Sequence, residues 1–215
     1  MMPARRVLMM VVALAAVAAL GDPAWAGPAS DQLKMQMDRV IRVLTDPELK
    51  SEAKATERRA VIRKIANDIF DFRETTQRCL GRHWHARTPA ERDEFVALFA
   101  DLLERAYIGK IELYSGEKIA FLGEAGGDEQ VTVRTRLVTK QNAEVPVDYR
   151  MHRRGERWLA YDVSIEGISL VANYRAQFNK IIQTSSYAEL VKKLKAKSED
   201  SAEADTPIHR ASQTR

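Results

Sequence analysis

The chain has 215 residues, of which 45% are hydrophobic and 30% are charged. This length predicts about one folded domain with a substantial core, and this composition excludes a chain that is disordered throughout. One cysteine excludes an internal disulfide framework and a cysteine-rich zinc module. The formal charge of +4 is the difference between 34 basic and 30 acidic residues that are interspersed along the chain. No concentrated basic patch therefore indicates nucleic-acid binding.

The first 26 residues have the pattern of a secretory signal peptide. Arg5 and Arg6 precede an apolar run over residues 7–20, and Ala24 and Ala26 place small residues at a cleavage site. The run is shorter than the roughly 20 residues of a membrane span, although an uncleaved anchor is the alternative. We expect cleavage after Ala26 and an exported, soluble, periplasmic chain that begins at Gly27.

The other end of the chain is poor in residues that could be buried. Residues 198–215 contain mainly small and charged residues, and Ile208 is the one large aliphatic residue among them. This composition predicts a disordered tail. A single domain over residues 27–197 remains.

Apolar residues at helical spacing predict four helices in the first half of the domain. The fourth has the clearest start, because Thr88-Pro89-Ala90-Glu91 is a capping box with proline at the first helical position. The expected helices cover residues 30–44, a segment capped by Thr56 that reaches Phe70, residues 72–80, and a segment from Pro89 to Tyr107 or as far as Leu113.

After Gly116 the apolar period changes from 3.6 to 2, which predicts strands. The expected strands cover residues 119–122, 131–137, 145–151 and 159–165, with a loop over 123–128. Their short connections predict antiparallel pairing. Two more helices are expected at residues 170–183 and 187–197. The sequence thus predicts an α+β fold with N-terminal helices, a four-stranded antiparallel meander sheet, and C-terminal helices packed on one sheet face.

The sequence contains no phosphate loop, dinucleotide fingerprint, nucleophile elbow or zinc-protease motif. Cys79, His83 and His85 could be imagined around a metal, but they are an incomplete ligand set; Cys79 could also be a nucleophile with His83 as its base. Asp162 and Glu166 could form an acid–base pair, or they could meet arginines and cap a helix. We favour the structural interpretation for all five residues and expect no metal and no cofactor.

An ordered set of short segments resembles the MlaC, or toluene-tolerance, family of periplasmic phospholipid carriers from Gram-negative bacteria. The resemblance covers about residues 30–194. The segments are Phe70-Asp71-Phe72, Thr88-Pro89 with Glu91, Phe95 and Phe99, then Leu103, Tyr107 and Tyr114-Ser115-Gly116-Glu117, and finally residues 158–171 (WLAYDVSIEGISLV), Asn173-Tyr174-Arg175 and Gln177-Phe178.

The resemblance implies a monomeric carrier, not an enzyme, that holds phospholipid acyl chains in an apolar cavity between sheet and helices. It also implies exchange of lipid with an outer-membrane lipoprotein–porin complex and with an inner-membrane ABC transporter that bears a substrate-binding ring protein. Some relatives belong to hopanoid pathways, so a hopanoid or another lipid is an alternative cargo.

The expected lipid-binding residues lie on the segments that would enclose this cavity. Phe99, Leu103 and Tyr107 would form one wall; Val147, Tyr149, Met151, Tyr161 and Val163 a second; and Ile168, Leu170, Val171 and Tyr174 the lid or rim. The same residue types also fill an ordinary core. Two other hypotheses therefore stay open, an enzyme that uses Asp162 or Glu166 at the cavity mouth and a periplasmic adaptor with a filled core.

Overall fold

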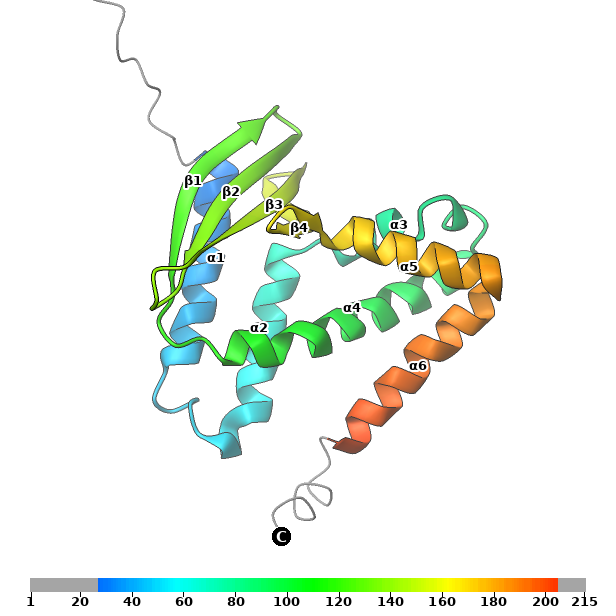
Figure 1. Ribbon diagram of the computed structural model, residues 1–215, viewed down its shortest axis with the longest axis horizontal. Helices are drawn as coiled ribbons and strands as arrows, with labels where there is room; N and C mark the ends of the chain where they lie inside the picture. Colours follow the sequence, from blue (N-terminus) through cyan, green and yellow to red (C-terminus); the bar gives the residue numbers. More distant parts are fainter. Residues whose placement is uncertain (1–26, 205–215) are drawn as a thin grey trace, which may run out of the picture.

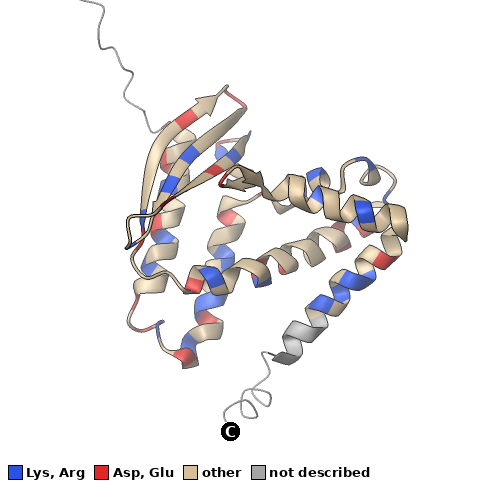
Figure 2. Cartoon of the chain, viewed as in Figure 1, with Lys and Arg blue, Asp and Glu red and all other residues tan. Residues whose placement is uncertain are grey.

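The computed structural model describes residues 27–204, which form six α-helices and one antiparallel sheet, an α+β fold as predicted (Figure 1). The predicted signal peptide and residues 205–215 lie outside the described residues. The helices are α1 (Pro28–Thr45), α2 (Ala55–Ile69), α3 (Phe72–Leu80), α4 (Pro89–Glu112), α5 (Leu170–Thr184) and α6 (Tyr187–Ala204), with 3-10 turns at Glu52–Lys54 and Gly81–His83. Acidic and basic residues occur together on most of these elements (Figure 2).

Local capping fixes most helix boundaries where the sequence predicted them. The Thr88 hydroxyl accepts a hydrogen bond from the Glu91 amide at 3.2 Å, and the Glu91 carboxylate accepts one from the Thr88 amide at 2.8 Å. The Asp71 carboxylate caps α3 by accepting a hydrogen bond from the Glu74 amide at 2.8 Å, and Gly81 ends α3 with a φ of +53°. Thr56 is not a cap: α2 already begins at Ala55, because the preceding 3-10 turn leads directly into it.

The last helix is longer than predicted. Helix α6 continues to Ala204, so it passes the expected start of the tail at Ser198. No proline occurs between Ser198 and Pro207, and the Ser, Glu, Asp and Ala residues of this segment are compatible with a helix.

The sheet has five strands in the order β1-β2-β3-β4-β5, one more than the four predicted. They are β1 (Lys118–Gly126), β2 (Gln130–Val138), β3 (Glu144–Arg154), β4 (Arg157–Ile165) and β5 (Ile168–Ser169). Strand β5 was missed because two residues cannot show alternation; a turn at Glu166 and Gly167 pairs it with the end of β4. Strand β1 also runs through most of the predicted loop, with a bulge between Phe121 and Gly123 that breaks its alternation.

The apolar residues form two separate clusters. The sheet cluster joins α1 and α2 to one face of the sheet and includes Leu33, Ile65, Val133, Met151 and Trp158. The helical cluster joins α3, α4, α5 and α6 and includes Leu80, Phe95, Phe99, Phe178 and Leu190. Two clusters in one domain leave a boundary between them, which lies between the sheet and α4.

An ion-pair clamp holds α4 on α2 across this boundary. The Glu112 carboxylate of α4 accepts hydrogen bonds from Arg58 at 2.8 Å and from Arg59 at 3.0 Å. One turn later on α2 and two turns earlier on α4, Arg63 pairs with Glu104. Arg58 is 9% exposed, so its pair with Glu112 is largely shielded from water, whereas the Arg63 side chain is 60% exposed.

Candidate functional site

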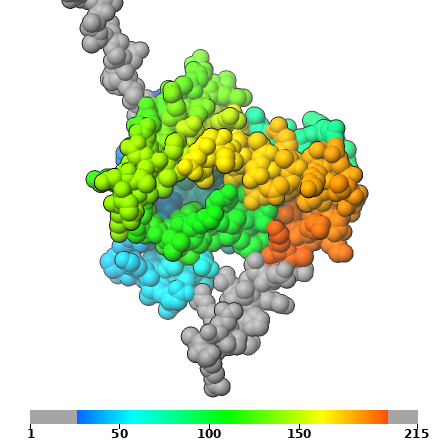
Figure 3. Space-filling model, viewed as in Figure 1, coloured from blue at the N-terminus to red at the C-terminus, as the bar shows by residue number. Residues whose placement is uncertain are grey.

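The molecular surface is hollowed between the sheet and α4, where the two apolar clusters face each other. In the space-filling view, β3 and β4 border this hollow on one side, α4 borders it on the other, and α1 is visible at its floor (Figure 3). Because α4 packs mainly on α3 and α6 rather than on the sheet, the sheet side and the helical side approach without closing on each other.

Helix α4 presents one apolar face built from every fourth residue. Phe99 and Leu103 are buried in the helical cluster, and Tyr107 is half-buried at its edge. The Phe99 ring meets the Tyr174 ring edge-on at 4.9 Å, which brings α5 onto the same face. Burial raises the pKa of the Tyr174 phenol, and nearby Tyr107 raises it further. The structure therefore brings the predicted α4 wall and part of the predicted rim together.

Tyr149 is the aromatic residue in the middle of β3, on the sheet face that also carries Met151. In the ladder it lies opposite Val133 on one side and Val163 on the other. Burial raises the pKa of its phenol to about 12. Among the described residues, none forms a hydrogen bond with its hydroxyl. The side chain is half-buried, so part of it stays accessible at the sheet face.

The other predicted sheet residues divide by depth. Val147 and Val163 are half-buried beside Tyr149. Met151 is completely buried in the sheet cluster, so it supports the wall from within.

Tyr161 lies on the opposite side of the sheet from Tyr149. A bulge in the β3–β4 ladder leaves Tyr161 as the extra residue between Ala160 and Asp162, and an extra residue changes which side chain faces which side. Its ring lies 3.9 Å from the Arg78 guanidinium and 5.5 Å from the His152 ring. The structure therefore does not bring Tyr161 to the hollow.

The predicted rim residues also differ in exposure. Val171 is buried in the helical cluster, and Leu170 packs against that cluster half-buried. Ile168 is 69% exposed in β5, next to Ile165, which is 42% exposed. The β4–β5 turn thus presents an apolar tip to solvent.

Comparison with known proteins identifies the family of this chain. The sequence matches the MlaC protein family over residues 34–196. The chain belongs to the MlaC family. It is also similar to a phospholipid-binding protein from Ralstonia solanacearum whose structure was solved in complex with a phospholipid. The two share 28% sequence identity over 81% of this chain and 98% of the other, with a TM-score of 0.70. The resemblance seen in the sequence is confirmed.

In this MlaC-family chain, Asp162 has a structural role that the geometry defines. One carboxylate oxygen accepts a hydrogen bond from the Val171 amide at 3.0 Å, and the other accepts one from the Ser169 hydroxyl at 2.6 Å. Arg150 approaches the same carboxylate at 3.4 Å. Glu166 is an exposed turn residue with a φ of +51°. The two carboxylates therefore do not form the acid–base pair considered above.

Cys79, His83 and His85, the residues considered as metal ligands, have three different environments in this MlaC-family chain. Burial raises the pKa of the Cys79 thiol to about 12, and its sulfur lies 3.9 Å from the Val171 carbonyl oxygen. His83 Nε2 forms a hydrogen bond with Asn179 at 3.0 Å, and His85 is exposed. Within residues 27–204, no three His, Cys, Asp or Glu side chains come close enough to hold a metal ion. None of the helices in that range has the length and apolar character to cross a membrane.

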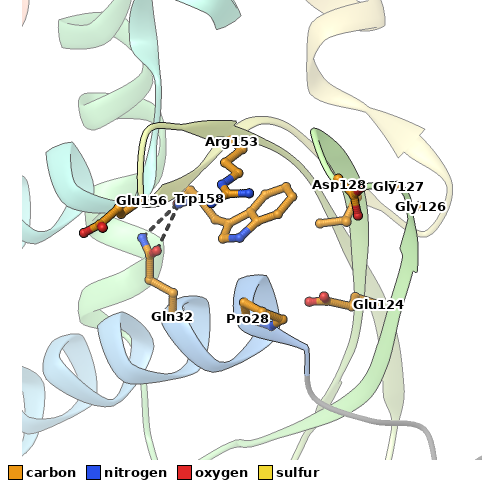
Figure 4. Close-up of a pocket in the computed structure, with 10 residues that line it drawn as sticks. Pro28, Gln32, Glu124, Gly126, Gly127, Asp128, Arg153, Glu156 and Trp158 are labelled. Atoms are coloured by element: carbon orange, nitrogen blue, oxygen red, sulfur yellow. Dashed lines mark hydrogen bonds between the residues drawn. The ribbon is translucent and has the colours of Figure 1, made fainter.

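Two further pockets of the MlaC-family chain lie along α1, where the sequence indicated nothing. One has a volume of about 360 Å³ between α1 and the start of β1, with Met37, Ile41 and Phe121 on its apolar side. The other, of about 510 Å³, lies at the start of α1 beside the β1–β2 and β3–β4 turns. Figure 4 shows Glu124 of this pocket near Pro28, and Asp128 on the same rim. Both pockets are missed by sequence reasoning because their sides lie far apart in the chain.

Proposed function

We propose that this MlaC-family protein is a periplasmic lipid carrier that holds phospholipid acyl chains in the hollow between the sheet and α4. The observation that carries the proposal is the pair of apolar clusters that face each other across an open boundary. The phospholipid complex of the Ralstonia solanacearum protein supports the choice of ligand. The hydroxyl of Tyr149 has no protein partner among the described residues, as expected of a wall that a mobile, apolar ligand covers.

The proposed lining comes from both sides of the hollow. Leu103, Tyr107 and Tyr174 belong to the helical side, and Val147, Tyr149 and Val163 belong to the sheet side. Phe99, Met151, Leu170 and Val171 support these residues from behind, and Ile168 forms an exposed lip. Tyr161 has no part in the lining, because its contacts are with Arg78 and His152.

The energetics of acyl chains explain why a carrier is needed. Moving two chains of about 15 methylenes each into water costs on the order of 24 kcal/mol, at about 0.8 kcal/mol per buried CH₂. A carrier therefore has to offer an apolar surrounding that matches a bilayer. A surrounding that binds much more tightly would prevent release to the next membrane component.

The wider cycle is part of the same proposal. The protein is exported by its signal peptide, cleaved after Ala26, and acts as a monomer. It exchanges phospholipid between an outer-membrane lipoprotein–porin complex and an inner-membrane ABC transporter with its substrate-binding ring protein. It carries lipid and catalyses no reaction, in keeping with the commitment of Asp162 to helix capping and with the buried, un-ionised Cys79 thiol.

The test begins with the full chain, exported and purified without detergent. Native mass spectrometry should find lipid bound in a stoichiometric amount to the chain. Organic extraction then identifies this lipid as a glycerophospholipid, a hopanoid or another lipid. Val147→Trp should lower the bound fraction several-fold, because it fills the hollow. Arg134→Trp is the matched control on the exposed face of β2. A protein that is empty after purification and stays empty after incubation with phospholipid vesicles would overturn the proposal.

A further inference from the structure

The start of α1 is capped by a residue from a distant strand. Gly27 is the N-cap residue and has no side chain to cap the helix. Instead, Glu124 of β1 accepts hydrogen bonds from the Ser30 amide at 2.8 Å and from the Ser30 hydroxyl at 3.0 Å. Ala29 and Ser30 are completely buried. The first turn of α1 is thus fixed to the sheet through one carboxylate.

The second oxygen of this carboxylate lies against Gly27. A Cβ atom added at Gly27 would overlap Oε1 and Cδ of Glu124, so glycine is the residue that fits here without moving the carboxylate. Because the Cβ position is about 2.5 Å from the nitrogen on the same Cα, the Gly27 nitrogen lies within roughly 4.3 Å of Oε1. This upper bound is slightly beyond the ion-pair limit of about 4 Å, so a small shift of the carboxylate would complete an ion pair.

The surroundings favour a positive charge at that nitrogen. The pocket at the start of α1 carries three carboxylates, Glu124, Asp128 and Glu156, and one guanidinium, Arg153. Arg153 is directed to the Gly155 carbonyl, to which its Nε donates a hydrogen bond. An ammonium at a helix N-terminus is unfavourable beside the helix dipole, and an adjacent carboxylate offsets that cost.

We propose that Glu124 is the receptor for the mature amino terminus, so that the Gly27 ammonium and the Glu124 carboxylate form an ion pair which fixes α1 to β1. The inference rests on the export that the proposed function includes. In the processing step, a signal peptidase uses water to hydrolyse the Ala26–Gly27 peptide bond, which leaves a carboxylate on Ala26 and an ammonium on Gly27. A neutral amide nitrogen beside Glu124 thereby becomes a charged group. The helix that floors the hollow gains its last anchor only after processing.

The first measurement is the intact mass of the protein exported from the full chain, which should begin at Gly27. Chains that begin at Gly27 and at Ala26 are then compared by thermal unfolding at pH 7. The Gly27 chain should unfold about 2–4 °C higher, the shift that a modest ion pair gives in a domain of this size. Glu124→Gln should lower the unfolding temperature and remove the difference between the two chains. Asp128→Asn, on the same pocket rim, is the control that should preserve it.

The second measurement follows the Gly27 amino group by NMR as a function of pH. Its pKa should lie above the ordinary value of an amino terminus, about 7.7–8.0, and return to that value in Glu124→Gln. The proposal is overturned if the exported chain begins elsewhere, if both chains unfold at the same temperature, or if the amine titrates normally. Lipid extraction from the same samples tests the carrier function separately, because neither unfolding nor amine titration requires bound lipid.

Discussion

The Asp162 carboxylate of β4 accepts a hydrogen bond from the Val171 amide at 3.0 Å, in the first turn of α5. This bond links the end of the sheet to the first helix of the C-terminal pair. Because Asp162 is 3% exposed and Val171 belongs to the helical cluster, this buried link joins the sheet half of the protein to the helical half.

Replacing Asp162 should separate these halves. Asp162→Ala leaves the buried Val171 amide and the Ser169 hydroxyl without their acceptor, so we expect the free energy of unfolding to fall by about 2–4 kcal/mol. Urea denaturation measures this change. Glu166→Gln is the control, an exposed carboxylate four residues away that should shift stability by less than about 0.5 kcal/mol. Equal effects of the two substitutions would contradict the capping role of Asp162.

The hydroxyl of Tyr149 should be dispensable for folding. Tyr149→Phe removes a group without a hydrogen-bond partner among the described residues, so lipid-free protein should be as stable as the wild type or up to about 1 kcal/mol more stable. Tyr161→Phe is the comparison on the other sheet face, where the hydroxyl donates to Gln130 at 3.5 Å. A loss of stability in Tyr149→Phe would show that the hydroxyl has a partner after all.

The raised pKa of Tyr149 makes the stability of the protein depend on pH in the alkaline range. Burial raises the pKa of its phenol from the model-compound value of 10.0 to about 12. The folded state therefore favours the neutral phenol, and the resulting stability is fully present below pH 10 and lost as the pH rises toward 12. Absorbance at alkaline pH should show two phenols that ionise late, because the pKa of Tyr187 is also raised to about 12, chiefly by burial. Tyr149→Phe should remove one of the two and leave the other. If the late-ionising fraction is unchanged in that variant, Tyr149 is not enclosed.

The clamp between α2 and α4 predicts the opposite pH dependence. Burial alone raises the pKa of the Glu112 carboxyl, but hydrogen bonds and charge from Arg59 and Arg58 outweigh it, so the pKa lies below the ordinary range. The stability it contributes is present above the unfolded-state pKa of about 4.3 and is lost as the pH falls through the folded-state pKa. Acid unfolding of the wild type should therefore include this loss.

Glu112→Gln isolates the contribution of the clamp. At pH 7 we expect the variant to be less stable by about 3–5 kcal/mol, because Arg58 is left buried without its partner. The difference from wild type should shrink as the pH falls below the unfolded-state pKa of about 4.3 and then through the lower folded-state pKa of Glu112, where the carboxyl becomes neutral. Glu57→Gln, in an exposed pair with Lys54, should show no such pH-dependent difference. A constant difference across this pH range would exclude the ionised clamp as its source.

How much of this architecture the sequence predicts depends on whether the cause is local. The helix over residues 72–80 has the bounds that the sequence predicts, and the structure shows that both of its ends have local causes, a cap from Asp71 and a stop at Gly81. The extra strand β5 and the length of β1 depend on long-range pairing and on a bulge, which alternation cannot show. A single bulge also moves Tyr161 to the opposite face from the one its position in the strand predicts.

The candidate site follows the same division. Apolar periodicity selects segments that border the hollow, but the face toward a cavity and the face toward a core use the same side chains. It does not separate Met151, which is completely buried, from Tyr149, which is not. The contact between Glu124 and Ser30 joins residues 94 positions apart, so neither local pattern nor spacing predicts it.

The reactivity of the Cys79 thiol should report opening of the helical cluster. Burial, with a further contribution from Asp162, raises the pKa of its thiol from 9.0 to about 12, and the thiolate is the form that attacks a disulfide reagent. At pH 8 the native protein should therefore react about 1,000-fold more slowly with a chromogenic disulfide reagent than the unfolded chain does. The rates in native buffer and in concentrated urea give this ratio, and Cys79→Ser gives the background.

Because the Cys79 thiol lies 3.9 Å from the Val171 carbonyl oxygen, Asp162→Ala should accelerate the native reaction by loosening the start of α5. Rapid modification of the wild-type native protein would show that this cluster is open in solution and that the hollow has no rigid helical wall.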